Sequence, residues 1–161
     1  MGAIGGVAPI PQPLMQDRME PNDPPPIEID TKLVASHGHS QAIGLRFVGS
    51  GDDWAEMAFD YDPKLAMNAE TGVLASGPLI SLIDSASAVA ILAKTGRGRP
   101  MATLDMRIDY VRAAVPGKPI IARGQCYRVA RNVAFVRCDA HDGDPNDLVA
   151  HAICSFYMSD E

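Results

Sequence analysis

The sequence reads SGPLISLIDSASAVAILAK between residues 76 and 94, and this stretch decides the fold. Between Gly77 and Lys94 it carries one charged residue, Asp84, among Leu, Ile, Val, Ala and Ser. The triplet Ser76-Gly77-Pro78 predicts a helix start, because Ser or Gly suits an N-cap and Pro is favoured at the first helical position. Apolar residues lie on nearly every face of this helix, which predicts that it is buried on all sides.

Asp84 falls about two turns into the predicted helix. Burying an unpaired carboxylate costs several kcal/mol, so this side chain must be paired, neutralised or used in chemistry. A hydrogen bond to a neighbouring loop is the commoner explanation of such an acid, because structural pairs also perturb carboxylates. The helix pattern alone therefore leaves both a structural and a catalytic role open.

The length and composition of the chain indicate a single domain and a cytoplasmic location. A chain of 161 residues can bury a sizeable core, and its formal net charge of −6 disfavours nucleic acid as a partner. The three cysteines, Cys126, Cys138 and Cys154, lack CxxC spacing. They are expected to be reduced thiols in the core that neither bind zinc nor form disulfides. No charged segment precedes an apolar core at the N-terminus, which disfavours a secretory signal. The apolar helix is too short and too rich in Ser to span a membrane.

The chain divides into two unequal parts. Residues 1–27 hold seven of the 13 prolines and show no sustained apolar period, so we expect an extended or flexible N-terminal arm. Residues 28–161 form the predicted domain, which begins with a short helix at 29–36. Two strand-like runs, at 41–47 and 54–61, flank the hairpin sequence Gly49-Ser50-Gly51-Asp52.

Four further strand-like runs follow the helix. They span residues 102–112, 120–129, 133–141 and 148–158, and tight turns such as Pro116-Gly117-Lys118-Pro119 separate them. In the first run the apolar Leu104, Met106, Ile108 and Tyr110 alternate with the charged Asp105, Arg107 and Asp109. Consecutive hairpins predict an α+β fold, with an antiparallel sheet of about six strands wrapped around one long central helix.

The segment NAETGVLASGPLISLID, residues 68–84, resembles the loop-and-helix signature of hotdog-fold acyl-CoA thioesterases. The closest branch is the phenylacetate-degradation, PaaI-like type, whose pattern is an Asn, a Gly, His-Gly-Gly and then an aliphatic helix with an Asp. The match continues at 103–106, at Tyr110, at 116–117, at 128–135 and at 148–152, and it covers about residues 41–158. One departure is that Ala75-Ser76-Gly77 stands where relatives have His-Gly-Gly.

This resemblance implies a site shared by two subunits of a dimer, often paired into a tetramer. Asp84 would be the general base or nucleophile toward the thioester carbonyl, and Thr103 would orient water or the acid. The start of the helix, at Ser76 with Gly77 beside it, would supply the backbone N–H that faces the carbonyl oxygen. The family Asn aligns near Asn68, one residue off.

The resemblance also implies where coenzyme A lies, as part of an acyl-CoA substrate. One half of its site would be the strand end at Tyr110, Val111 and Arg112. The other half would be the turn with Arg128, Arg131 and Asn132, where the two arginines would contact phosphates; as solvated turn charges they have an equally simple explanation. No cofactor and no metal are expected.

Three functions follow from these patterns. The first is an acyl-CoA thioesterase, and the second is a non-catalytic acyl-CoA-binding protein, which the missing His at Ala75 favours. The third, an enoyl-CoA hydratase of the same fold, is disfavoured because that branch needs a His on the central helix and none lies between His39 and His141. His37 and His39 could form a metal pair, but no further ligand follows at a suitable spacing, so a flexible segment before the first strand is the better explanation.

Overall fold

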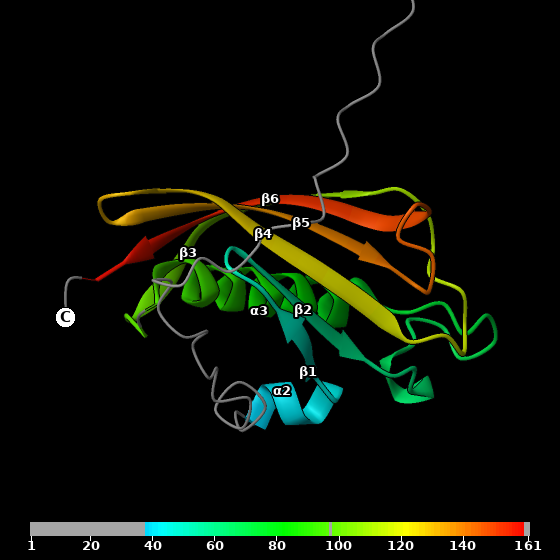
Figure 1. Ribbon diagram of the computed structural model, residues 1–161. Helices are drawn as coiled ribbons and strands as arrows, with labels where there is room; N and C mark the ends of the chain where they lie inside the picture. Colours follow the sequence, from blue (N-terminus) through cyan, green and yellow to red (C-terminus); the bar gives the residue numbers. More distant parts are fainter. Residues whose placement is uncertain (1–37, 97, 160–161) are drawn as a thin grey trace, which may run out of the picture.

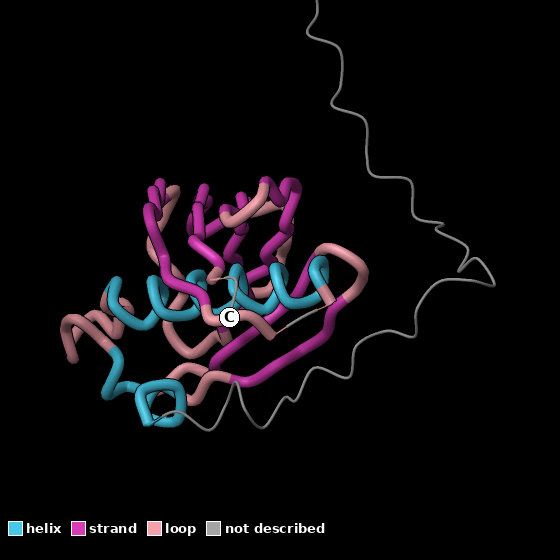
Figure 2. The backbone as a smooth tube through the Cα atoms, turned by 90° about the vertical axis from the view of Figure 1, so that its left-hand side faces the viewer, coloured by secondary structure: helices cyan, strands magenta, loops and turns pink. Residues whose placement is uncertain are grey.

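A six-stranded antiparallel sheet packs against one long helix, α3 (Ser76–Thr95), in the computed structural model (Figure 1). The structure describes residues 38–96 and 98–159. The predicted α+β fold, with its antiparallel sheet and single long helix, is confirmed. Figure 2 shows strands on both sides of α3, because the sheet curls around the helix. The predicted arm, residues 1–27, and the helix predicted at 29–36 lie outside the described residues.

The strands follow the order β1-β2-β4-β5-β6-β3 across the sheet, so β3 lies at one edge beside β6. They are β1 (Arg46–Ser50), β2 (Trp54–Phe59), β3 (Met101–Tyr110), β4 (Ile120–Ala130), β5 (Val133–His141) and β6 (Leu148–Met158). The predicted bounds of β5 and β6 are confirmed at both ends. The prediction that consecutive hairpins join the last four strands is wrong for β3 and β4, which do not pair.

The connection between β3 and β4 is longer than a hairpin loop. The predicted turn at 116–119 does reverse the chain, and the Lys118 N–H donates to the Val115 carbonyl at 3.2 Å. Residues 111–119 nevertheless carry the chain from the edge strand to the middle of the sheet, where β4 pairs with β2 and β5. Alternation within a strand identifies its buried face but not its neighbour, so the pattern could not reveal this crossover.

The first half of the strand predicted at 41–47 is helical. Helix α2 (Gly38–Ile43) ends at Gly44, whose φ of 71° is the left-handed conformation that often terminates helices. The Leu45 N–H donates to the Ser40 carbonyl at 2.9 Å across this end. The β1–β2 hairpin then follows as predicted, and the Gly51 N–H closes it by donating to the Trp54 carbonyl at 3.0 Å.

One side of α3 lies directly on the sheet. Leu82, Ile83, Ala86, Ala90 and Ile91 have no exposed surface. The helix backbone approaches β4 so closely that a Cβ placed on Gly124 would lie 2.8 Å from the Ala86 carbonyl oxygen. By length and composition α3 could cross a membrane, contrary to the prediction that it is too short, but half of it is buried in this core.

The opposite side of α3 is only partly covered by the described chain, through a contact between His39 of α2 and Ser81, so the prediction of a helix buried on all sides is wrong. Gly77, Ile80, Ser81 and Asp84 share this side, because residues three, four and seven positions apart lie on one helix face. Ile80 is 41% exposed, Gly77 is exposed, and Ser81 and Asp84 are partly exposed. We call these four residues the open face of α3.

Backbone hydrogen bonds hold the two ends of the loop before α3 together. The loop begins with the short 3-10 helix η1 (Pro63–Leu65), which the Asp62 side chain caps. Ala66 and Leu74 form an isolated bridge, and the Ala75 N–H donates to the Leu65 carbonyl at 2.9 Å. These bonds fix the point at which the chain enters α3.

Strand β3 carries a bulge that breaks its predicted alternation. Thr103 pairs with Phe156 and Asp105 pairs with Ser155, so Leu104 has no partner and is 58% exposed. Met106 and Ile108 pack partly on the core as predicted. Among residues 38–96 and 98–159, no strand pairs with the outer side of β3, which leaves a sheet edge that can bind another strand.

Candidate active site

The structure brings the predicted acid and the predicted hydroxyl together. The Thr103 hydroxyl donates to the Asp84 carboxylate, Oγ1 to Oδ1, at 2.7 Å. Thr103 lies beside the β3 bulge, and Asp84 lies on the open face of α3. An ionised carboxylate only accepts hydrogen bonds, so this contact orients Asp84 and leaves its second oxygen available to take a proton.

The start of α3 offers free backbone N–H groups. The N-cap is Ala75, one or two residues before the predicted Ser76 or Gly77, and no side chain caps this end of the helix. Ser76 and Gly77 are therefore the first helical residues, whose N–H groups have no acceptor inside a helix. Within the described residues these two groups make no hydrogen bond. Together with the helix dipole they can stabilise a developing negative charge.

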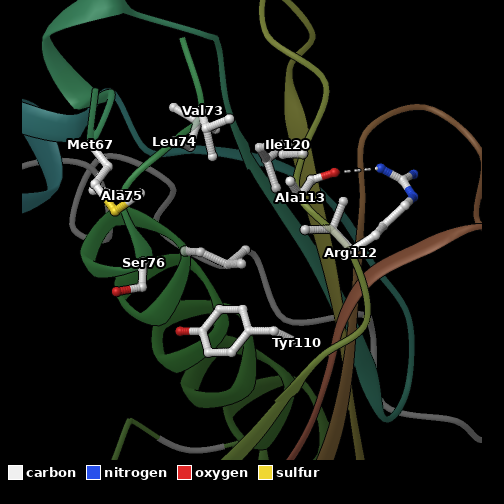
Figure 3. Close-up of a pocket in the computed structure, with 12 residues that line it drawn as sticks. Met67, Val73, Leu74, Ala75, Ser76, Tyr110, Arg112, Ala113 and Ile120 are labelled. Atoms are coloured by element: carbon white, nitrogen blue, oxygen red, sulfur yellow. Dashed lines mark hydrogen bonds between the residues drawn. The ribbon is translucent and has the colours of Figure 1, made fainter. Parts of the chain in front are cut away.

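An apolar cavity of about 220 Å³ opens beside this helix start (Figure 3). The loop before α3, the first turn of α3 and the segment after β3 form its walls. Its lining residues are Met67, Val73, Leu74, Ala75, Ser76, Leu79, Tyr110, Arg112, Ala113, Ala114, Ile120 and Val149. Figure 3 shows Ser76 and the Tyr110 ring on the same side of the cavity, with Arg112 across from them.

Arg112 uses every one of its donors within the chain. It binds both carboxylate oxygens of Asp142 at 2.8 Å, the side chain and carbonyl of Asp147, and the Ala113 carbonyl. These hydrogen bonds, mainly that to Asp142, raise the pKa of Arg112, and the Arg112 guanidinium holds the pKa of Asp142 well below its usual range. Arg112 therefore holds the wall of the cavity and keeps no free donor for a phosphate.

The remaining residues predicted for coenzyme A fall at two opposite ends of the sheet. Tyr110, 52% exposed, and Val111, 62% exposed, lie at the end of β3. Arg128, Arg131 and Asn132 belong to the β4–β5 hairpin, whose Asn132 carbonyl accepts from Met158 N–H beside the start of β3. The two halves therefore do not meet within one chain.

The structure keeps Asn68 outside the cavity. Its side-chain oxygen accepts hydrogen bonds from the N–H groups of Glu70 at 2.7 Å and Thr71 at 3.3 Å. Its carbonyl accepts from Gly72, which adopts a positive φ of 66°. Asn68 thus shapes the loop that leads to α3, and it is not among the described residues that line the cavity.

Two turns of helix separate the acid from the free N–H groups. At 1.5 Å per residue, Ser76 and Asp84 of one chain lie about 12 Å apart along α3. The helix start lies near Tyr110 at the end of β3, whereas Asp84 contacts Thr103 near the beginning of β3. Because α3 and β3 run in opposite directions, one chain does not bring both groups to one carbonyl.

One residue of the site was missed in the sequence. His39 lies in α2, not in a flexible segment, and its Nε2 is 2.8 Å from the Ser81 hydroxyl on the open face of α3. The two residues are separated by 42 positions, so no local pattern links them. His37, the other half of the suggested metal pair, lies outside the described residues, among which no group of three metal-ligating side chains occurs.

Comparison with known proteins gives one family match. Residues 71–149 match the thioesterase superfamily. A curated relative, the medium/long-chain acyl-CoA thioesterase YigI of Salmonella typhimurium, is 25% identical over 118 residues, which cover 65% of this chain and 76% of the relative.

Solved structures show the same arrangement of sheet and helix. A protein from Pseudomonas aeruginosa is 29% identical with a TM-score of 0.72, over 80% of this chain and 95% of the other. The PaaI protein from the phenylacetic acid degradation operon of E. coli is 16% identical with a TM-score of 0.69, over 79% and 88% of the two chains. At that identity the second match is a likeness of fold.

Proposed function

The chain belongs to the thioesterase superfamily and has its hotdog fold, and on this basis we propose that it hydrolyses acyl-CoA thioesters to a free acid and coenzyme A. One observation carries the proposal: Asp84, held by Thr103, lies on an open helix face, and the same helix begins with uncapped N–H groups beside an apolar cavity. These are the two functions that thioester hydrolysis needs, a base and an oxyanion donor.

The complete site belongs to a homodimer in this proposal. Two copies that join their β3 edges antiparallel around a two-fold axis place the end of one β3 beside the beginning of the other. The partner subunit's Ser76 and Gly77 then approach Asp84 and Thr103. This arrangement resolves the separation of about 12 Å along α3 within one chain, and it covers the open face of both helices.

The reaction then follows from the chemistry of the two groups. Ionised Asp84 takes a proton from water, whose oxygen attacks the thioester carbonyl carbon. The electrons of the carbonyl double bond move to the carbonyl oxygen, where the N–H groups at the helix start of the partner stabilise the negative charge. One such donor stabilises the transition state by about 3 kcal/mol. Collapse of the intermediate breaks the carbon–sulfur bond, and the proton on Asp84 passes to the departing thiolate.

The cavity is the place for the acyl chain. Its walls of Leu, Val, Ile, Met and Ala side chains match an aliphatic group, and Ser76 and Tyr110 stand at one side of it. Arg112, which Asp142 holds in place, forms part of the wall opposite, and this wall would limit the length of the chain. The name of the relative YigI, a medium/long-chain acyl-CoA thioesterase, agrees with an aliphatic substrate. We therefore propose medium-chain acyl-CoA as the substrate class.

Coenzyme A would bind across the dimer. The hairpin turn with Arg128, Arg131 and Asn132 lies on the side of the sheet where β3 begins. Antiparallel pairing of two β3 edges brings this side of one subunit toward Tyr110 and Val111 of the other. The two halves of the proposed coenzyme A site, distant in one chain, then face each other, with the arginines supplying charge to phosphates.

The test is thiol release from a series of acyl-CoA esters, with wild type and Asp84→Asn. This variant keeps the size of the side chain and its acceptor for Thr103, but it cannot take a proton, so the rate should fall at least about 100-fold. Asp60→Asn is the matched control, because that carboxylate is exposed and pairs only with Arg46 among the described residues. If wild-type protein binds acyl-CoA and releases no thiol, the chain is an acyl-CoA-binding protein.

A further inference from the structure

A chain of hydrogen bonds connects α2 to the first turn of α3. His39 Nε2 lies 2.8 Å from the Ser81 hydroxyl oxygen, and the same hydroxyl lies 3.2 Å from the Gly77 carbonyl oxygen. Ser81 and Gly77 both belong to the open face of α3. The imidazole of a helix outside the sheet is thereby linked to the turn that carries the free N–H groups.

The direction of these bonds follows from counting protons. A serine hydroxyl has one hydrogen, and the Gly77 carbonyl can only accept. With Ser81 donating to Gly77, its oxygen is left to accept from His39, and this arrangement predicts that His39 carries a hydrogen on Nε2. The other ring nitrogen, Nδ1, makes no hydrogen bond to the part of the chain that the structure describes.

Gly77 is the residue in this turn whose backbone conformation costs the most entropy to fix. It has no Cβ, so its backbone loses more conformational freedom on ordering than that of any other residue. The following residue is Pro78, which supplies no N–H, and the N-cap Ala75 contributes no side-chain bond. The Gly77 carbonyl belongs to the Gly77–Pro78 peptide, which has no N–H, so the bond from Ser81 acts on rotation about the Cα–C bond of Gly77. It thereby restricts the backbone at the Cα that carries the Gly77 N–H on its other side.

We infer that His39 is a positioning residue for thioester hydrolysis, which acts through Ser81 to hold the Gly77 backbone in place for the developing oxyanion. The inference rests on the proposed function and deepens it. The other end of α2 is fixed independently, because Ile43 is buried in the core. Loss of the His39 bond should therefore loosen the turn of α3 without releasing α2 from the fold.

The test compares His39→Ala, His39→Gln, Ser81→Ala and the double variant His39→Ala/Ser81→Ala by thiol release. Removing one hydrogen bond of ordinary strength should lower kcat about fivefold to tenfold with KM nearly unchanged. The Gln side chain can donate to Ser81 in place of the imidazole, so His39→Gln should recover most of the rate. His151→Ala is the matched control, because that imidazole binds Asp139 on the sheet.

The double variant decides whether His39 acts through Ser81. If it does, His39→Ala/Ser81→Ala is no slower than Ser81→Ala alone, since the second change removes a bond already lost. The inference would be overturned, with the proposed function left intact, by any of three results. These are a double variant whose rate loss is the product of the two single losses, a His39→Ala rate equal to that of the wild type, and a rise in KM at constant kcat. Absence of thiol release from the wild type would instead overturn the proposed function.

A second readout does not depend on activity. Nitrogen-15 NMR of the histidine rings distinguishes the two neutral tautomers, and His39 should carry its hydrogen on Nε2 in the wild type. Ser81→Ala should shift this signal and leave those of His141 and His151 in place. A hydrogen on Nδ1 of His39 in the wild type contradicts the direction of the hydrogen-bond chain and so the inference.

Discussion

Arg112 and Asp142 form a bidentate salt bridge, in which both carboxylate oxygens accept hydrogen bonds of 2.8 Å from the two terminal nitrogens of the guanidinium. Asp142 is 3% exposed and also accepts a 2.8 Å bond from the Val115 N–H. The pair joins the segment after β3 to the turn before β6, and its Arg112 side chain lines the cavity. The shape of the proposed acyl site and the stability of the fold therefore depend on the same contact.

The first prediction concerns acid stability. Because Arg112 lowers the pKa of Asp142 in the folded chain, this carboxylate stabilises the fold above the ordinary Asp value of 3.8, and the contribution is lost as pH falls toward the lower folded value. Asp142→Asn should reduce the free energy of unfolding by about 2–3 kcal/mol at pH 7. Urea titrations should show this difference shrinking below about pH 4.

Asp147→Asn is the control for that measurement. Its side chain also binds Arg112, at 3.0 Å, but it is 64% exposed, so its loss should cost under about 1 kcal/mol. An Asp142→Asn deficit that stays constant between pH 7 and pH 3 would contradict the assignment of the effect to ionisation of Asp142.

The second prediction concerns the contact between α3 and β4. A Cβ at Gly124 would lie 2.8 Å from the Ala86 carbonyl oxygen and 3.1 Å from the Ser87 nitrogen, which are backbone atoms that cannot move independently. Gly124→Ala should lower the free energy of unfolding by about 2–3 kcal/mol, measured by chemical denaturation. Gly98→Ala, where nothing lies within 4 Å, should stay close to wild type; similar losses in both variants would refute the packing argument.

The third prediction tests whether the site is shared between subunits. Ser76→Pro deletes one free N–H at the first helical position, where proline is well tolerated, and the preceding Ala75 already has the extended backbone that proline requires. Both Ser76→Pro and Asp84→Asn should be about 100-fold slower than wild type. Each variant alone therefore has no working site.

Mixing the two variants after unfolding and refolding gives the decisive result. In a mixed dimer, one site combines the intact acid of one subunit with the intact helix start of the other. Half of the dimers are mixed and each has one such site, so thiol release should recover to about a quarter of the wild-type rate. If acid and N–H came from the same chain, mixing would restore nothing.

The fourth prediction concerns the length of the acyl group. Ala113→Phe places a ring in the cavity of about 220 Å³, so kcat/KM should fall steeply for longer acyl chains and change little for acetyl-CoA and butyryl-CoA. Ala113→Ser keeps the volume nearly unchanged and serves as the control. An equal loss for every chain length would mean that the acyl group does not enter this cavity.

Much of the fold could be predicted because the deciding signals are local. The lone charge in an apolar stretch identifies α3, and Asp142-Gly143 and Arg131-Asn132 mark the turns that bound β5. The helix at Gly38–Ile43 was missed, since six residues followed by a positive-φ glycine show too little periodicity to separate helix from strand. The neighbours of β3 were also missed, because strand order depends on how the sheet closes around α3.

The candidate site was predicted unevenly for a similar reason. Asp84 and Thr103 could be proposed together because a family resemblance relates their positions, and the structure joins them by one hydrogen bond. The contact of His39 with Ser81, the full use of the Arg112 donors and the bulge at Leu104 depend on tertiary structure. No pattern within a single segment contains that information.

The identity of residue 75 sets a conflict for anyone who engineers this protein. An Asp or Ser at that position would cap α3 and raise the melting temperature, since a side-chain cap is worth about 1 kcal/mol. The same oxygen would occupy the backbone hydrogens that α3 otherwise offers to a ligand. Selection for a higher melting temperature alone would therefore enrich variants that are more stable but turn over less substrate.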